Sequence, residues 1–537
     1  MKPFALSLLL LLFLCPLFAD EGQHHEEMTA QQLGTVHFPV SCSAAAQESF
    51  TRGVALLHSF WYEEAEKAFQ KAATGDPGCA MAHWGVAMSL WHQLWNHPDE
   101  GVIKRGQAES KRALHLHAPT ARERDYIAAA KAFYSGPGKR KYDARASAYS
   151  AAMRQVYERY PNDYEGAAFY ALSLLALEPG KSKEAADVLE KLFAKQPDHP
   201  GVAHYLIHSY DSPERAQLGL PAARRYAQIA PAAPHALHMP SHIFARLGLW
   251  QDDIDSNLAS IAASQHSTEM HMGGGSHEFH AMDFLVYAYL QTGQEAKVQQ
   301  VIEEVKAMPP MKDMYGDGFD PRLSALVSFE AMQALELHHW TEAAALQPVE
   351  GATLGAGSIT HWARAIGAAH IGNFDQVRVE LAQMEAIKQQ LIGQKKPQFM
   401  IDAVDQDRQE VIAWIDHSEG KDEEAAKLLH AIAEKEGGMS STSGGIPARE
   451  MLADMLLEKH HPKEALAEYE ADLKANPNRF NALYGAAQSA EMLGENEAAN
   501  RYYAQLVKQC AGSSSNRPEI SQAKAVISAS LVETHPK

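Results

Sequence analysis

A short pattern of small and large apolar residues, closed by a proline, recurs along the chain and limits what it can fold into. The pattern stands at offsets 0, 4, 7 and 12 in Ala65, Phe69, Ala72 and Pro77. It returns in Ala185, Leu189, Leu192 and Pro197, and in part in Ala465, Tyr469 and Pro477. Offsets of four and seven place residues on one helix face, and proline ends the helix. The sequence therefore predicts repeated helices, and alternating strand patterns are almost absent.

This pattern resembles the second helix and closing proline of the tetratricopeptide repeat (TPR), a helix pair of about 34 residues. The first helix of such a pair shows small residues beside large ones, as in Trp84-Gly85 and Tyr484-Gly485. Turn glycines follow at Gly248, Gly293, Gly372, Gly420 and Gly494. The resemblance implies an all-α fold, a TPR-like α-solenoid in which antiparallel helix pairs form a right-handed superhelix. Stacked pairs bury each other's apolar faces and leave a concave surface.

Repeats placed by their glycine or proline begin near residues 46, 166, 200, 234, 279, 358, 406, 446 and 480. We therefore expect TPR-like helix pairs over 46–160, His-rich TPR repeats over 166–310, central repeats over 321–435, C-terminal repeats over 446–510 and a tail over 511–537. The interval from Gly248 to Gly293 is 45 residues, 11 more than the period. We assign the additional residues to an insertion at 264–276.

The first 19 residues are expected to be a signal peptide, followed by a leader segment over 20–45. Lys2 supplies a positive start, an apolar stretch follows from Phe4 to Leu14, and Ala19 offers a cleavage point. The stretch is short for a bilayer span, and no later segment is apolar enough to cross a membrane. We therefore expect a secreted or periplasmic protein. Lipoprotein anchoring through Cys15 is the weaker alternative, because bulky Leu14 precedes that cysteine.

Three cysteines remain after this cleavage, and export makes a disulfide feasible. Cys42 precedes the first helix of one repeat, and Cys79 begins the next repeat. Because the helix starts of neighbouring repeats lie side by side in a solenoid, we predict a Cys42–Cys79 disulfide with Cys510 unpaired. The alternative is that Cys42 and Cys79 are two small buried residues.

Charge and motifs exclude several functions. The formal net charge is -19, and no long run of Lys or Arg provides the basic face that a nucleic-acid partner needs. The sequence also lacks a phosphate-binding glycine loop after a strand, Cys-x-x-Cys, His-Glu-x-x-His and Gly-x-Ser-x-Gly. We expect no nucleic-acid partner, and no known catalytic motif argues for an enzyme.

Histidine is the unusual residue of this chain. Ten of the 28 histidines lie within residues 199–280, where an even spread would put about four. The TPR resemblance implies that positions 2, 5, 9 and 12 of each first helix line the concave groove. Those positions of three successive repeats hold His204, His208 and Asp211, then His235, His238 and His242, then His280, Asp283 and Tyr287. His277 stands just before the third helix.

This row predicts a metal site. His204/His208 and His238/His242 are one helical turn apart, and adjacent helices lie about 8–10 Å apart, so rings from two helices can converge on one ion. Imidazole suits zinc, copper and iron, and the thioethers of Met239, Met270 and Met272 favour copper. The predicted ligands are His204, His208, His235, His238, His242, His277, His280 and Asp283. Asp211, Tyr287 and His271 are predicted to support them or to line the groove.

Two other interpretations of the histidines remain open. A row of His, Asp and Tyr is also an ordinary polar surface for a peptide, and histidines between stacked helices can serve as hydrogen-bonded core residues. For the remaining histidines we expect structural roles, as at His58, His83, His115, His338 and His370.

Several segments look like those of a His-rich group of exported bacterial TPR proteins. They are His204-Tyr-Leu-Ile-His208, the stretch from His235 to Ile243, His277-Glu-Phe-His-Ala-Met-Asp283, and the opening stretch from Cys42 to Met81. The resemblance implies a fold and a location outside the cytoplasm but no activity. We therefore consider a protein-interaction scaffold with a metal-binding histidine cluster, a metal carrier or sensor, and a metalloenzyme with His208 or Asp211 as general base.

Overall fold

The computed structural model describes residues 28–94, 97–137, 140–177, 179–274, 277–311, 319–436 and 445–534. The predicted signal peptide, with Cys15, and residues 20–27 of the leader segment lie outside these ranges. Within them the regular secondary structure is α-helix and one short 3-10 helix, and no strand occurs. None of the helices described there is long and apolar enough to cross a membrane.

The helices of the N-terminal half follow in this order: α1 Ala30–Leu33, α2 Ala44–His58, α3 Tyr62–Gly75, α4 Ala80–Ser89, α5 Glu100–His115, α6 Ala121–Tyr134, α7 Tyr142–Arg159, α8 Tyr164–Leu175, α9 Ser182–Phe193, α10 Pro200–Tyr210, α11 Ala216–Ile229, α12 Pro234–His238, α13 Pro240–Arg246 and α14 Trp250–Glu269. A 3-10 turn, η1, spans Pro179–Lys181.

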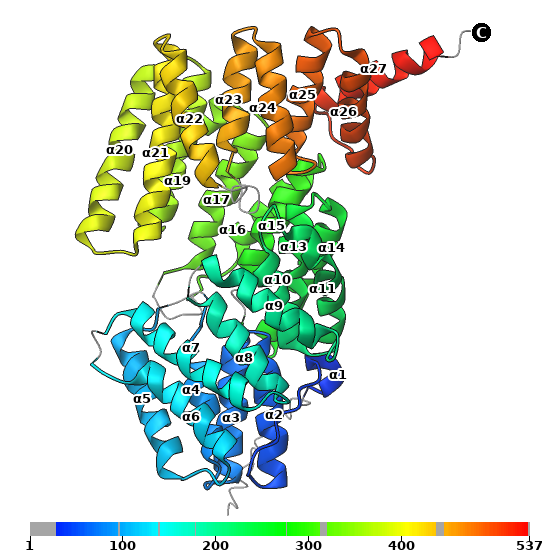
Figure 1. Cartoon of the computed structure of the whole chain (residues 1–537). Helices are drawn as coiled ribbons and strands as arrows, with labels where there is room; N and C mark the ends of the chain where they lie inside the picture. The colour runs from blue at the N-terminus through cyan, green and yellow to red at the C-terminus, as the bar shows by residue number, and fades with distance from the viewer. Residues whose placement is uncertain are drawn as a thin grey trace, which may run out of the picture.

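The helices of the C-terminal half are α15 His277–Gln291, α16 Glu295–Ala307, α17 Pro321–Glu336, α18 Trp340–Ala345, α19 Leu354–His370, α20 Phe374–Gly393, α21 Gln398–Ser418, α22 Asp422–Glu436, α23 Ala448–Glu458, α24 Pro462–Ala475, α25 Phe480–Met492, α26 Asn496–Gln509 and α27 Pro518–Thr534. Consecutive helices stack as pairs from the bottom to the top of the molecule (Figure 1). This is the TPR-like α-solenoid that the repeat pattern predicts.

The repeat frame matches the helix starts closely in some places and poorly in others. α10, α12 and α25 begin at residues 200, 234 and 480, where the frame places them. α21 begins at residue 398, eight residues before the predicted 406, because this helix is 21 residues long and ends just before Gly420, whose position set the frame. Residues 264–269 of the predicted insertion continue α14, and the described residues that follow, 270–274, are not helical.

An aromatic ring on the second helix of one pair lies over a glycine on the first helix of the next pair. A Cβ atom added at Gly85 would lie 2.2 Å from the Phe69 ring, and one at Gly485 would lie 2.2 Å from the Tyr469 ring. The recurrent spacing in the sequence therefore reflects one contact, in which glycine lets a large buried ring fill the space between stacked pairs.

The N-terminal helices also contact repeats that are distant in the sequence. A Cβ atom at Gly34 would meet Pro200 at 2.9 Å, and the Ala232 amide donates to the Gln32 carbonyl at 3.1 Å. The Trp61 indole Nε1 donates to the Gly273 carbonyl at 2.7 Å. These contacts place α1 against the start of α10 and the loop after α11, and the turn between α2 and α3 against the turn after α14, close to segments that hold the predicted histidines.

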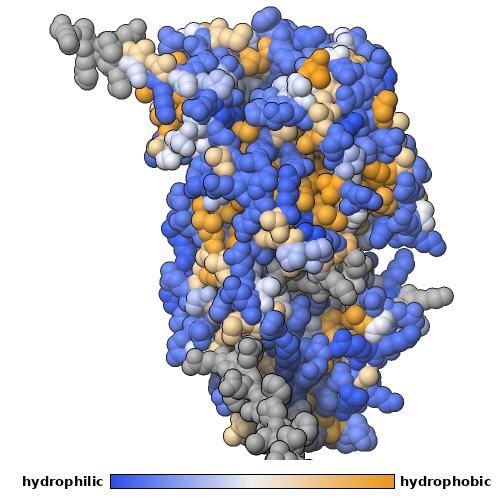
Figure 2. Space-filling view, turned by 180° about the vertical axis from the view of Figure 1, so that it is seen from behind, coloured by the Kyte–Doolittle hydropathy of each residue, from blue (hydrophilic) through white to orange (hydrophobic). Residues whose placement is uncertain are grey.

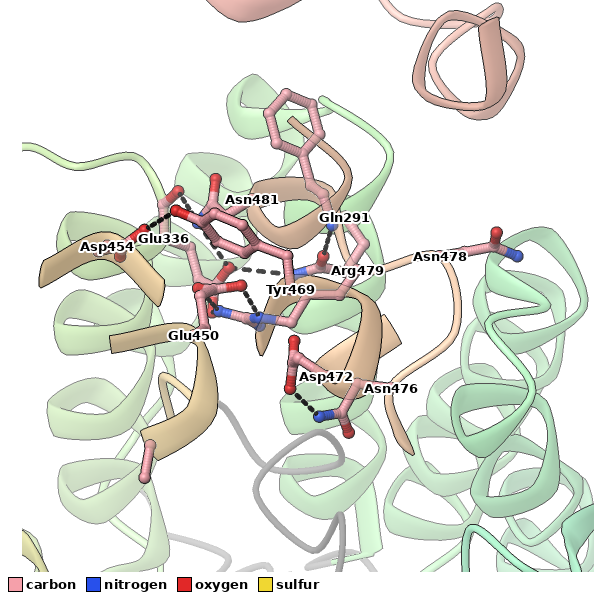
Figure 3. A network of polar contacts seen from close by, with 12 residues as sticks. Gln291, Glu336, Glu450, Asp454, Tyr469, Asp472, Asn476, Asn478, Arg479 and Asn481 are labelled. Atoms are coloured by element: carbon pink, nitrogen blue, oxygen red, sulfur yellow. Dashed lines mark hydrogen bonds and ion pairs between the residues drawn. The ribbon is translucent and has the colours of Figure 1, made fainter. Parts of the chain in front are cut away.

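The C-terminal repeats are joined to the middle of the chain through buried Arg479 (Figure 3). Its guanidinium donates to both carboxylate oxygens of Glu450 at 2.7 Å, to the Tyr287 hydroxyl at 2.8 Å, and pairs with Glu336 at 2.9 Å. These partners come from α15, α17 and α23, whereas Arg479 directly precedes α25. The contact therefore holds four helices of different repeats together.

Cys42 and Cys79 form a disulfide that joins the segment before α2 to the start of α4. Cys510 is a buried free thiol at the end of α26, and burial raises its pKa to about 12. A neutral buried thiol of this kind is a poor nucleophile and metal ligand.

Gly248 gives a test of the contact between middle and C-terminal repeats. Gly248 has φ +62°, and a Cβ atom there would lie 2.1 Å from the Pro477 carbonyl oxygen. Gly494 is the matched control, since it has φ +77° and no atom within 4 Å of an added Cβ. We expect Gly494→Ala to lower the free energy of unfolding by about 1 kcal/mol, and Gly248→Ala by roughly 2–3 kcal/mol more. Urea unfolding measures both values, and equal losses would contradict the proposed contact.

Candidate metal centre

Four helices bring the histidines together. His204 and His208 lie on α10, His235 and His238 on α12, His242 on α13, and His277 and His280 on α15. Prolines begin three of these helices, at Pro200, Pro234 and Pro240, where a missing N–H is harmless. Pro240 also separates α12 from α13, so the first helix of this repeat is broken between His238 and His242.

The first group, named here the inner triad, consists of His204, His208 and His235. The Nε2 atom of His204 lies 3.1 Å from the Nε2 atoms of both His208 and His235. One ligand atom from each residue lies within 4.8 Å of the other two. The Nδ1 atom of His204 lies 2.7 Å from the His58 carbonyl oxygen. A carbonyl only accepts, so Nδ1 carries the proton and the Nε2 lone pair points into the triad.

The second group, named here the outer triad, consists of His238, His242 and His280, and its ligand atoms also lie within 4.8 Å of one another. The Nδ1 atom of His242 donates to the Asp211 carboxylate at 2.9 Å, and that carboxylate also accepts from Arg246 at 2.9 Å. The Nδ1 atom of His238 lies 2.7 Å from the Asn257 side-chain oxygen.

The orientation of Asn257 is determined by Asp253. The Asn257 amide nitrogen lies 3.0 Å from the Asp253 main-chain carbonyl, which can only accept. The amide oxygen therefore faces His238 and accepts from its Nδ1. A ring nitrogen that donates to a fixed acceptor sets the tautomer and the direction of the other nitrogen, which is the arrangement around protein metal ligands.

These hydrogen bonds leave a conflict in the outer triad. The Nε2 atoms of His238 and His242 lie 3.1 Å apart, and both rings already use Nδ1 as the donor. If both rings are neutral, two lone pairs face each other at hydrogen-bond distance. A cation between them removes the conflict, because ligand nitrogens about 2.0–2.1 Å from one ion in tetrahedral geometry lie roughly 3.3 Å apart. The alternative is a second proton on one ring.

Burial keeps most of these rings neutral. It lowers the pKa of His208 to about 3, with a further contribution from the facing His242. It also holds the pKa values of His204, His235 and His238 well below the ordinary value, and their histidine neighbours add to the effect. Neutral imidazole is the form that binds a metal ion.

The prediction that these histidines line an open groove is only partly right. His204 and His235 are buried, whereas His280 is exposed and His242 partly so. The N-terminal helices cause the difference, because the Phe60 ring lies 4.3 Å from the His204 ring and 5.6 Å from the His235 ring, measured between centroids. Phe60 has φ +54°, a left-handed turn that directs the chain over the inner triad. The centre is therefore covered on one side and open beside His280.

Besides Asp211, which bonds to His242, four predicted site residues lie outside both triads. His277 is close, with its ring centroid 5.2 Å from that of His235. Asp283 is half-buried one turn after His280, and burial raises its pKa to about 7. Tyr287 bonds to Arg479 instead, because seven residues of helix place it about 10 Å beyond His280. His271 is exposed in the turn after α14.

The predicted thioether ligands are not part of either triad. Met270, His271 and Met272 line a separate hollow of about 730 Å³ that also borders Met28 and Trp61. The positions of Met270 and Met272 therefore give no reason to prefer copper over zinc or iron.

Sequence reasoning missed a third buried group, formed by His58, Glu165 and His199. The Nε2 atoms of His58 and His199 donate to the two Glu165 oxygens at 2.8 and 3.0 Å. Their Nδ1 atoms accept from the Tyr205 hydroxyl at 2.8 Å and the Val202 amide at 3.3 Å. All four ring nitrogens therefore have partners, which makes this group a structural network. Its members come from three helix pairs with no common spacing, so no sequence pattern could have revealed it.

No family model and no curated protein matches this sequence. Among solved structures, a human IFIT1 dimer with PPP-AAAA is 13% identical, with 80% of this chain and 91% of that chain covered and a TM-score of 0.36. Yeast Tom70 is 12% identical, with 91% and 97% covered and a TM-score of 0.31. Likeness this weak carries no argument about function, so the assignment to the TPR-like solenoids rests on the helix pairs themselves.

Glu165→Gln tests the structural role of the third group. The glutamine oxygen can accept a hydrogen bond from only one of the two histidines. The glutamine N–H group then faces the N–H group of the other histidine, so that buried donor loses its partner. We expect the free energy of unfolding to fall by about 3 kcal/mol, measured by urea denaturation. Glu109→Gln is the control, because Glu109 bonds to His83 at 2.7 Å in a partly exposed pair and should cost less than about 1 kcal/mol. Similar losses in both variants would contradict the assigned role.

Proposed function

We propose that this protein binds transition-metal ions through its inner and outer triads. The observation that carries the proposal is the 3.1 Å approach of the His238 and His242 Nε2 atoms, whose Nδ1 atoms are both committed as donors. The Asn257 and Asp211 acceptors orient these ligands from behind, as second-layer groups do at metal sites. Copper, zinc and iron all suit a set of imidazole ligands.

The ligand count bears on the choice between a carrier and an enzyme. Three histidines in each triad leave a coordination position open, which is the count typical of catalytic rather than structural zinc sites. The general base foreseen for an enzyme has little support, however. Burial alone raises the pKa of Asp211, but the hydrogen bonds and charges of His242 and Arg246 outweigh it and hold that pKa well below its ordinary value. Metal binding, by a carrier or sensor, is therefore the function we propose, with catalysis as the alternative.

The competing arrangement places a second proton on His242, whose ring would then pair with Asp211 and donate to His238. Metal analysis separates the two. We expect the chain beginning at Asp20 to take up copper, zinc or iron at one or more ions per molecule, counted by elemental mass spectrometry after gel filtration. His238→Ala combined with His242→Ala should remove the ion of the outer triad, and Asp211→Asn should weaken binding roughly 10–100-fold.

The control for these variants is His266→Ala combined with His271→Ala. It removes two histidines that are exposed and lie outside both triads. Its metal content should equal that of the unmodified chain, and circular dichroism should show that all variants stay folded. A folded protein that takes up no transition-metal ion would overturn the proposal and favour the protonated histidine pair.

A protein-interaction scaffold is the second candidate. Several large apolar side chains are exposed on and beside α20 and α21, including Val379 at 58% and Phe399 at 72%. Apolar surface gathers on the same side of the molecule when it is seen from behind (Figure 2). Exposed apolar patches on soluble proteins often mark partner sites. This observation favours a partner on α20 and α21 rather than in the concave groove near the histidines.

Paired substitutions test the scaffold. We expect Val379→Glu combined with Phe399→Glu to abolish capture of a protein partner from envelope extracts, because a buried charge is costly in an apolar interface. Leu218→Glu is the matched control, since Leu218 is 58% exposed on α11, away from this surface. If the paired variant captures the partner as well as the unmodified chain and the Leu218→Glu control do, this surface is excluded as the partner site.

We also propose export to the periplasm or the exterior. The Cys42–Cys79 disulfide supports it, because such bonds persist in oxidising compartments. The apolar start of the sequence supports it independently. Recovery outside the cytoplasm of a chain beginning at Asp20 is the expected result, and a cytoplasmic chain with an uncut N-terminus would contradict it.

A further inference from the structure

The two triads are direct neighbours. The His235 and His238 rings have centroids 6.1 Å apart, and the His208 and His242 rings have centroids 6.4 Å apart. His235 and His238 lie on the same short helix, α12, nearly one turn apart. At these separations no further side chain fits between the facing rings, so ions in the two triads would be adjacent.

The charges around the triads indicate what a pair of ions would need. The members of both triads are histidines, whose imidazole rings bring no negative charge. The Asp211 carboxylate beside the outer triad is engaged by His242 and Arg246. Two divalent cations side by side would repel each other strongly at low dielectric. A small anion between them reduces that repulsion and fills the position that each triad leaves open.

Access to this position is asymmetric. Phe60 covers the inner triad, whereas His280 and, in part, His242 of the outer triad are open to solvent. A small ligand therefore reaches the centre most directly from the outer triad, since His208 of the inner triad is half-buried and His204 and His235 are buried.

We infer that the inner and outer triads hold a pair of metal ions that share one small bridging anion, which enters beside His280. This inference rests on the proposed metal binding and extends it to a two-ion centre. Two-ion centres in proteins commonly have ions about 3.5–4 Å apart, a distance that one hydroxide or azide can bridge.

Copper(II) is a suitable probe, because two bridged copper(II) ions couple magnetically and lose paramagnetic signal. The chain beginning at Asp20 is saturated with copper(II), freed of excess metal by gel filtration, and studied by native mass spectrometry and paramagnetic resonance. We expect two ions per chain but less than half of the signal that two isolated ions would give. Azide should add a charge-transfer absorption band at one azide per ion pair.

Variants that destroy one triad provide the comparison. His204→Ala combined with His235→Ala should leave one ion with the full signal of a single isolated copper, and so should His238→Ala combined with His242→Ala. The second pair keeps the test valid if loss of the buried inner triad prevents folding. The variant with both His266→Ala and His271→Ala should behave like the unmodified chain.

Other results would overturn the inference. Two ions with the full signal of two isolated coppers would show separate sites. One ion at saturation would reject the pair while leaving the proposed metal binding intact. No bound ion at all would reject both.

Discussion

The fold depends on the burial of apolar faces between successive helix pairs, and at two of these interfaces a large ring of one pair lies against a glycine of the next. Phe69 over Gly85 and Tyr469 over Gly485 show it at opposite ends of the chain. A helix pair cannot bury its apolar face alone, so each pair packs against the next one along the solenoid. The stacking also fixes which residues of neighbouring first helices face each other, and so places the histidines of α10, α12, α13 and α15 in one region.

Stacking alone would leave those histidines on an open surface. The turn between α2 and α3 changes their environment, because Phe60 covers His204 and His235 while the carbonyl of His58 accepts from His204. The His58–Glu165–His199 network holds this turn in place, because each ring nitrogen of its two histidines has a hydrogen-bond partner. Arg479 plays a comparable part at the other end, where it joins α15 and α17 to the C-terminal repeats. A structural histidine group thus supports the two triads beside it.

Much of the candidate centre could be read from spacing. The pairs His204/His208 and His238/His242 lie one turn apart on a helix, and the repeat frame aligns the helices that hold them. Other assignments failed for reasons of three-dimensional distance. Tyr287 has the right position within its repeat but lies too far along α15, and His271 has a favourable neighbourhood in sequence but lies in an exposed turn. Asn257 could not be foreseen, because its role depends on a contact with His238 and on its orientation by Asp253.

The sequence by itself determined the helical repeats, because their signals are local: a spacing of apolar residues, a turn glycine and a closing proline. It also determined which helix faces hold the histidines, since helical periodicity and the repeat length follow from the chain alone. Only the tertiary structure decided that these histidines divide into two triads, that one is covered and the other open, and that a third group is satisfied internally. Those outcomes depend on contacts such as Phe60 with His204 and Glu165 with His58, whose partners are more than 100 residues apart. No local pattern encodes the distance or the direction of such contacts.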